Sequence, residues 1–237
     1  MSKVLSEFLY YHEDNPSIDI YLGDNAEILP LLQGGVDMIL TDPPYGINYQ
    51  SNMRVVSKQF DRIENDNNDS RFLLYPQMHK VLKEDCVLIA FCSFKNYSDD
   101  YKEIEKHFDI KNCIIWFKGG GGIGDLSHSL STDYEMAIVG HKGQCTLKGK
   151  RHGSVWKSNK VNPSDMRHPT EKPIDILEKM IDSFTNSNAL ILDPYLGCGS
   201  TLLACKELKR SGIGIEISEK YCEIARKRLV NTQVPFL

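Results

Sequence analysis

Short apolar runs alternate with segments of helical period along this 237-residue chain. Apolar runs of about four to eight residues bounded by turn residues predict strands, and apolar positions spaced three or four apart predict helices. We therefore expect an α/β fold with a mostly parallel sheet that contains one antiparallel hairpin, formed by residues 110–117 and 134–141. The pattern predicts strands at residues 18–22, 36–41, 87–92, 110–117, 134–141, 189–193 and 212–217, and helices at 26–32, 71–82, 97–108, 174–184 and 202–208.

A rigid acidic turn, Asp42-Pro-Pro-Tyr45, follows the predicted strand at residues 36–41. Proline lacks an N–H and fixes φ, so the two prolines stiffen the turn and leave the Pro43 carbonyl able to accept a hydrogen bond. The Asp42 carboxylate is a second acceptor, and Tyr45 supplies a flat face, so the turn suits a planar amine. By itself the tetrapeptide fits an ordinary Asp-Pro turn equally well.

A glycine-rich turn follows the predicted strand at residues 189–193 and precedes a predicted helix. Gly197 and Gly199 let the backbone approach a ligand, and the helix N-terminus behind them favours polar or anionic groups. Glu216, at the end of the next predicted strand, occupies the place of the ribose acceptor in nucleotide-binding α/β folds. The turn lacks the third glycine of a dinucleotide fingerprint and the Gly-Lys-Ser/Thr of a phosphate loop. It therefore favours a nucleoside without a pyrophosphate.

Three segments together resemble the amino-group DNA methyltransferases, which methylate N6 of adenine or N4 of cytosine. Asp193-Pro-Tyr-Leu-Gly-Cys-Gly-Ser-Thr201 looks like their S-adenosylmethionine loop, and Asp42-Pro-Pro-Tyr45 looks like their catalytic motif. His168-Pro-Thr-Glu-Lys-Pro173 resembles the segment that precedes this loop in one subgroup. The order of the motifs is that of the β class. The resemblance covers roughly residues 19–229 and implies a circularly permuted, Rossmann-like methyltransferase fold.

The resemblance implies a catalytic role for the residues of the tetrapeptide. Asp42 and the Pro43 carbonyl would accept hydrogen bonds from the target amine, and Pro44 belongs to the same motif. Tyr45 would stack on a base flipped out of duplex DNA. The reaction requires no metal, and the sequence offers no cluster of metal ligands.

The resemblance also implies a set of residues that bind S-adenosylmethionine. Glu216 would hold the ribose hydroxyls, and Asp24 would lie near the adenine, although by itself Asp24 is more typical of a helix N-cap. The serine, threonine and aspartate of the glycine-rich turn would meet the methionine end, and the segment at residues 168–172 would close over it. The complete expected set is Asp24, His168, Thr170, Lys172, Asp193, Pro194, Tyr195, Gly197, Gly199, Ser200, Thr201 and Glu216.

Composition indicates one compact enzyme domain over residues 1–237. Apolar residues make up 41% and charged residues 25% of the chain, as in ordinary globular proteins. No apolar run approaches the roughly 20 residues that span a membrane, and the first residues do not resemble a signal peptide. The seven cysteines include no Cys-x-x-Cys pair, which favours a reducing, cytoplasmic setting.

Basic residues gather in one part of a chain whose net charge is −4. The segment from His141 to Lys172 contains eight lysines and arginines but only two acidic residues. A basic segment on an acidic body is typical of a surface that faces a polyanion, but a solvated lysine-rich hairpin is also consistent with it. In the family that the chain resembles, the target-recognition region lies between the catalytic core and the His-Pro-Thr segment. The resemblance therefore implies a short target-recognition insertion at about residues 142–167 that binds double-stranded DNA. Its expected contacts are Lys148, Lys150, Arg151, Lys157 and Lys160.

Three alternatives stay open from the sequence. N4-cytosine enzymes share this layout but more often carry serine in place of Asp42, so the aspartate favours adenine. RNA guanine-N2 methyltransferases place the cofactor loop before the catalytic motif, which is the reverse of the order here. A catalytically inactive, DNA-binding subunit would not need both motifs intact. The short insertion also suggests help from a second subunit, as in a homodimer, and the polar segment at residues 46–70 suggests a flap over DNA.

Overall fold

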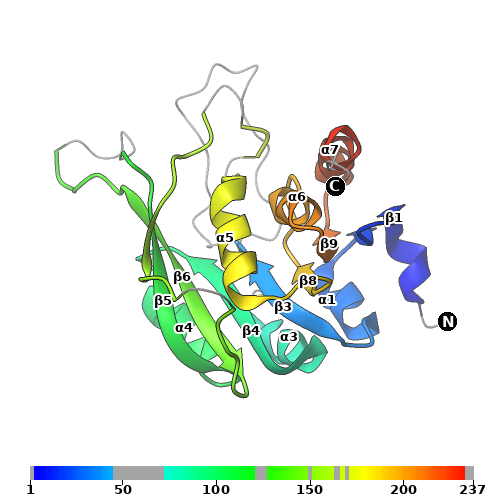
Figure 1. The fold of residues 1–237 in the computed structure, drawn as a ribbon, viewed down its shortest axis with the longest axis horizontal. Coiled ribbons are helices and arrows are strands. Elements are labelled where there is room, and N and C mark those ends of the chain that lie inside the picture. Colours follow the sequence, from blue (N-terminus) through cyan, green and yellow to red (C-terminus); the bar gives the residue numbers. More distant parts are fainter. Residues whose placement is uncertain are drawn as a thin grey trace.

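The computed structural model describes residues 3–44, 72–120, 127–148, 151–162, 166–168 and 171–232 (Figure 1). Tyr45, Lys150 and Thr170, together with the predicted flap at residues 46–70, lie outside the described residues. Within the described part of the chain, no helix is long and apolar enough to cross a lipid bilayer.

Nine strands of the described chain form one sheet in the order β1-β2-β9-β8-β3-β4-β6-β5-β7. The five strands from β2 to β4 in this order run parallel, β6 is antiparallel to both β4 and β5, and β1 is antiparallel to β2. The strands are β1 (Leu9–Glu13), β2 (Ile18–Leu22), β3 (Val36–Thr41), β4 (Leu82–Cys92), β5 (Asp109–Phe117), β6 (Tyr134–Lys142), β7 (Val155–Lys157), β8 (Leu190–Asp193) and β9 (Ser211–Glu216).

Helices cover both faces of this sheet (Figure 1). The helices are α1 (Asn25–Ile28), α3 (Tyr75–Val81), α4 (Tyr97–Ile104), α5 (Ile174–Phe184), α6 (Ser200–Glu207) and α7 (Glu219–Asn231), with 3-10 turns at Leu5–Phe8 and Leu29–Leu31. One buried cluster joins the sheet to α5, α6 and α7, and a second joins it to α1, α3 and α4. The structure is therefore a three-layer arrangement, and it confirms the α/β class and the mostly parallel sheet with an antiparallel pair that the sequence predicts.

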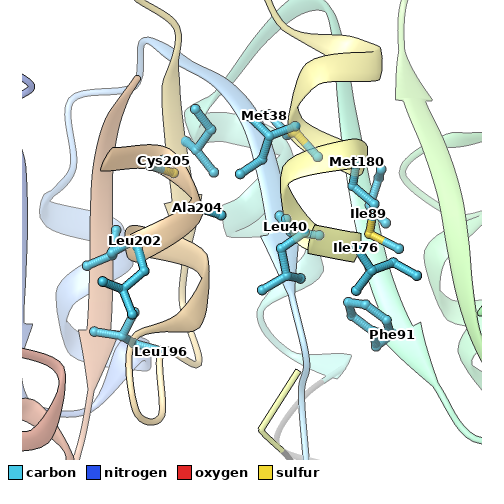
Figure 2. Packing of buried hydrophobic residues seen from close by; sticks show 14 of the residues in the cluster. Met38, Leu40, Ile89, Phe91, Ile176, Met180, Leu196, Leu202, Ala204 and Cys205 are labelled. Atoms are coloured by element: carbon cyan, nitrogen blue, oxygen red, sulfur yellow. The ribbon is translucent and has the colours of Figure 1, made fainter. Parts of the chain in front are cut away.

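Strand β3 shows why this sequence forms a central strand. Successive side chains of a strand point to opposite faces. Met38 and Leu40 accordingly pack with Ile176 and Leu202, which belong to α5 and α6 (Figure 2), while Ile39 belongs to the cluster on the other face. A side chain of this size contributes roughly 1.5–3 kcal/mol when it is fully buried, so both faces hold β3 in place.

The predicted helix at residues 174–184 is confirmed to the residue as α5. The predicted helix at residues 26–32 is wrong in length, because α1 ends at Ile28 and a 3-10 turn follows. Pro30 explains this difference, since it has no N–H for an α-helical bond and its ring collides with the preceding turn.

Other predicted boundaries also differ from the structure. The helix predicted at residues 97–108 ends at Ile104, and the strand predicted at residues 87–92 begins five residues earlier, at Leu82. This extension includes Asp85, a residue with a φ of 59°, and it lies where the register between β3 and β4 shifts. An irregularity of this kind hides the alternating pattern by which a strand is recognised.

The carboxyl ends of the central parallel strands meet along one edge of the sheet. We call this the carboxyl edge; its strand ends are Leu22, Thr41, Cys92, Asp193 and Glu216. Strand β3 is followed in the sheet by β4 on one side, whereas β8 is followed by β9 on the other side. The order of the sheet therefore changes direction between β3 and β8. In open α/β sheets, ligands bind outside the carboxyl ends of the strands at such a point.

Candidate active site

The acidic turn and the glycine-rich turn are neighbours at this point of the carboxyl edge. Strands β3 and β8 pair in parallel, with Met38 opposite Ile191 and Ile39 opposite Leu192. Asp42 follows β3, and Asp193 ends β8. About 150 residues of sequence separate these two segments, and the sheet brings them together.

Hydrogen bonds fix the path of the glycine-rich turn. The Asp193 carboxylate accepts from the Tyr195 backbone N–H at 3.1 Å and from the Thr201 hydroxyl at 2.6 Å. The Asn25 side-chain amide donates to the Pro194 carbonyl at 3.0 Å, and no sequence signal marked Asn25 in advance. Burial raises the pKa of Asp193 to about 7, although the bonds from Thr201 and Tyr195 act in the opposite direction. Asp193 and Thr201 therefore shape the turn through their contact with each other.

The two glycines of the turn serve different purposes. Gly197 has a φ of 54°, and a Cβ built on it would meet the His168 ring at 3.6 Å, so this position faces His168 across ordinary contact distance. Gly199 has a φ of 85°, and a Cβ there would lie 2.7 Å from the Ala225 Cβ. The sequence suggested that both glycines make room for a ligand. In the structure Gly199 makes room for helix α7.

Glu216 lies beside the glycine-rich turn, as the sequence predicts for a ribose acceptor. Its carboxylate accepts from the Gly197 N–H at 2.8 Å and from the Ser218 N–H at 2.9 Å. These bonds fix a half-buried carboxylate at the carboxyl end of β9, next to the backbone of Gly197. Such an arrangement fits a nucleoside whose hydroxyl groups need a fixed acceptor. After the neighbouring strand β2, Asp24 accepts from the Ala26 N–H at 2.8 Å and so caps α1.

Arg228 of α7 holds the far side of the turn, and the sequence did not single it out. Its guanidinium donates to the Cys198 carbonyl at 2.7 Å and to the Ser200 hydroxyl at 3.2 Å, and it lies 2.9 Å from the Glu171 carboxylate. Burial raises the pKa of Cys198 to about 12, so this thiol is protonated at neutral pH and is no nucleophile. The Ser200 hydroxyl is likewise engaged with α7.

His168 lies next to Gly197 of the glycine-rich turn. Its ring makes an edge-to-face contact with Tyr221 at 4.5 Å between centroids. Burial lowers the pKa of His168 to about 4, and the nearby charge of Lys172 acts in the same direction. The imidazole is therefore neutral at pH 7. The position of His168 agrees with a segment that closes over the turn.

Lys172 makes contacts that the sequence did not predict. Its ammonium donates to the Asp42 carboxylate, lies 3.2 Å from a Glu135 oxygen, and stands 4.8 Å above the centre of the Phe91 ring. Glu135 also accepts from Lys118 at 3.0 Å. Burial would lower the pKa of Lys172, but the carboxylates of Asp42 and Glu135 outweigh it and raise that pKa. Lys172 was expected at the methionine end of a cofactor, whereas in the structure it contacts the acidic turn.

The expected DNA contacts separate into two groups. Lys157 lies opposite Phe117 at the end of β5. Burial is the main cause that lowers the pKa of Lys160, and the positive charge of nearby Lys118 lowers it further. These lysines therefore lie near the carboxyl edge. At the other end of the sheet, the Lys148 N–H donates to the carbonyl of Ser183 near the end of α5. Arg151 lines a hollow of about 360 Å³ in the same region, together with Lys111, His141 and Phe184.

A family model described as DNA methylase (N6_N4_Mtase) matches residues 36–227, which include both turns and the strands that carry them. The chain belongs to this family of DNA methyltransferases. YubD of Escherichia coli (strain K12), named as a candidate methylase, is 32% identical over 219 residues, which cover 89% of each chain.

Solved structures of DNA methyltransferases share the fold. The structure of M1.HpyAVI in complex with S-adenosylmethionine superposes with a TM-score of 0.70 at 27% identity and covers 89% of this chain and 99% of the other. The cytosine-N4-specific PvuII DNA methyltransferase superposes with a TM-score of 0.74 at 15% identity and covers 92% of this chain and 88% of the other. S-adenosylmethionine is the cofactor of this methyltransferase. The glycine-rich turn and the fixed Glu216 carboxylate fit it.

Proposed function

We propose that this methyltransferase transfers a methyl group from S-adenosylmethionine to N6 of adenine in duplex DNA. The observation that carries the choice of adenine is Asp42, which stands beside the glycine-rich turn at the point where β3 and β8 meet. N4-cytosine enzymes of this layout more often have serine there.

The residues of the acidic turn suit the chemistry of an aromatic amine. The amine lone pair is delocalised into the ring, so the amine is a weak nucleophile. The Asp42 carboxylate and the Pro43 carbonyl would accept its two N–H groups and so draw the nitrogen toward a tetrahedral geometry. The same acceptors would stabilise the positive charge that develops on this nitrogen, which is an electrostatic contribution to catalysis. When bound, the cofactor supplies an electrophilic methyl group on a sulfonium.

Adenine within a duplex hides its amine, so the base must leave the stack before it can reach Asp42. Tyr45 would be the ring on which the extruded base stacks. It follows Pro44 directly in the sequence. Weakening the base pair of the target should therefore help any variant that has lost this ring.

Duplex DNA would bind across the carboxyl edge. Lys157 and Lys160 are exposed there, and Lys118 lies close to Lys160. Phosphate contacts by lysine supply most of the affinity that does not depend on DNA sequence. Lys148 and Arg151 would contact DNA only if the duplex extended to the opposite end of the sheet.

Two other assignments compete with this one. The first is N4-methylation of cytosine, because the PvuII enzyme has the same fold. The second is a DNA-binding subunit without activity of its own. The intact acidic turn and the ordered glycine-rich turn favour an active enzyme over this second assignment.

The test is mass spectrometry of nucleosides from duplex DNA treated with the protein and S-adenosylmethionine. We expect N6-methyladenine from the wild type. Asp42→Asn keeps the size of the side chain but removes its charge, so it should reduce product formation by about 100-fold or more, as for the loss of an electrostatic contact to a transition state. Cofactor binding, measured by calorimetry, should be retained because the lost interaction acts on charge that develops during transfer.

The outcomes separate the three assignments. N4-methylcytosine without N6-methyladenine would refute the adenine assignment and leave the methyltransferase intact. If no base is methylated while DNA still binds, the protein is the inactive subunit of a pair.

A further inference from the structure

A poorly exposed chain of alternating charges leads to Asp42. Lys118, Glu135, Lys172 and Asp42 follow one another in contact, with N–O distances of 3.0 Å between the first two and 3.2 Å between the second and third. The Lys172 side chain is 7% exposed, and those of Asp42 and Glu135 are 18% and 25% exposed. A buried ammonium costs several kcal/mol unless it is well paired, so the fold has a strong preference for this arrangement.

Each member of the chain comes from a different segment of the protein. Asp42 follows β3, Lys172 precedes α5, Glu135 lies on β6, and Lys118 follows β5. Phe91 of β4 lies beneath the Lys172 ammonium. The Lys172 ammonium is thus held by contacts with residues that lie on strands of the sheet or directly follow one. These contacts fix its position.

We propose that Lys172 and Glu135 are positioning residues for Asp42: Lys172 fixes the orientation of the catalytic carboxylate, and Glu135 holds Lys172. This inference rests on the proposed role of Asp42 as an acceptor for the target amine. A contact fixed before the substrate arrives avoids the cost of ordering the carboxylate during the reaction. The adjacent positive charge also favours the ionised form of the carboxylate, which is the form that accepts two hydrogen bonds.

Other charged and titratable groups face this chain. Asp193 of β8 is close enough for the charge of Asp42 to contribute to its raised pKa, and the charge of Lys172 contributes to the lowered pKa of His168. Because His168 is neutral near pH 7, the cations that lie close to Glu135 in the neutral range include Lys172, Lys118 and Lys160, and Lys172 also pairs with Asp42.

The experiment measures total transfer of radiolabelled methyl groups into duplex DNA in single turnover, over a range of pH, for the full chain. Lys172→Met keeps the length of the side chain without its charge, and should slow transfer by about 100-fold, the usual effect of misplacing a catalytic group by 1 Å. The acid limb of its pH profile should move to higher pH. Affinity for S-adenosylmethionine should change by less than about threefold. Lys172→Arg should restore part of the rate, because it restores the charge.

Glu135→Gln tests whether Glu135 acts through Lys172. Alone it should slow transfer by about tenfold, whereas added to Lys172→Met it should cause little further loss, because residues that act as a unit are not additive. Glu135→Gln keeps the size of the side chain. If Lys172→Met does not fold, the transfer rate and pH profile of Glu135→Gln test the proposal instead.

Lys206→Met is the matched control. Lys206 of α6 forms another poorly exposed ion pair, with Glu13 at 2.9 Å, outside the charge chain. Its loss should lower the melting temperature and leave the rate and pH profile of transfer as in the wild type.

Several results would overturn the proposal. An equal loss of cofactor affinity and rate in Lys172→Met would place Lys172 in the cofactor site. If the pH profile of Lys172→Met equals that of the wild type, the role of Lys172 and Glu135 is merely structural. The same conclusion follows if Lys206→Met shifts the pH profile as much as Lys172→Met does. Additive losses in the double variant would show that Glu135 acts independently. Total label counts methylated adenine and cytosine alike, so a wrong base assignment does not affect this test. A wild type that labels no DNA refutes the proposed function, and the positioning role with it.

Discussion

Beside the glycine-rich turn, Asp193 is buried and His168 is half-buried, and burial favours the neutral form of each. The pKa of Asp193 is about 7 in the folded protein, above the ordinary value of about 4, so the native state binds the extra proton between these values. Asp193 therefore makes the free energy of unfolding fall as pH rises from about 4 to 7. The pKa of His168 is about 4, below its ordinary value of about 6.5, so its contribution rises with pH over nearly the same range. The two effects oppose each other in the wild type.

Removing the contribution of Asp193 should reveal the pH dependence that His168 gives to the free energy of unfolding. Asp193→Asn should make the free energy of unfolding rise more steeply with pH than in the wild type between about pH 4 and 7, by at most about 1.4 kcal/mol per pH unit. Urea unfolding of the cofactor-free protein at several pH values measures this slope. Asp99→Asn is the control, because Asp99 is exposed in the first turn of α4. If the curves for wild type and Asp193→Asn run parallel, Asp193 does not carry the raised pKa.

The helices α6 and α7 approach each other where Gly199 meets Ala225, and this contact orients the first turn of α6 behind the glycine-rich turn. Gly199→Ala should destabilise the protein by about 2–4 kcal/mol, since overpacking costs about 1–3 kcal/mol and the left-handed backbone adds about 1 kcal/mol. Adding Ala225→Gly removes the collision, so the double variant should lose less stability than the sum of the two single variants. Chemical denaturation measures all three. Fully additive losses would mean that the two residues do not collide.

The elements that the sequence predicts correctly are those whose signal is local. Helix α5 follows from its apolar period, and the central strands follow from short, mostly apolar runs such as residues 36–41. The edge strands β1 and β7 were missed because one is half exposed and the other has three residues. Helix α7 was also missed, although Tyr221, Cys222, Ala225 and Leu229 repeat at helical spacing.

The candidate active site likewise contains features that the sequence predicts and features that it does not. The two turns are visible as motifs, whereas the contact of Lys172 with Asp42 joins residues 130 positions apart, and its formation depends on how β3 and α5 pack. The contacts of Asn25 and Arg228 with the glycine-rich turn have the same character. Long-range contacts of single polar side chains leave no periodic trace in a sequence.

The basic segment extends from one end of the sheet to the other, so its lysines and arginines should not contribute equally to DNA binding. Lys157→Glu with Lys160→Glu changes two exposed cations near the carboxyl edge. This pair should weaken binding and lower the slope of log affinity against log salt by about two. The slope is measured by fluorescence anisotropy of labelled duplex DNA.

Lys148→Glu with Arg151→Glu is the comparison pair, because it reverses the same number of charges at the opposite end of the sheet. It should change the salt slope less than the first pair. A larger effect from this second pair would place the duplex across the amino end of the sheet.

The strands in the middle of the sheet are the last to be made by the ribosome. Strands β8 and β9 lie between β2 and β3. About 150 residues are synthesised after β3 before β8 is made, which takes roughly 8–30 seconds at ordinary elongation rates. During this interval β2 and β3 each present an unpaired apolar edge, which is a template for aggregation. A chain that stops after Thr185 should therefore be insoluble or chaperone-bound, and co-expression of residues 186–237 should recover soluble protein. Solubility of the truncated chain alone would show that these edges are protected in the nascent protein.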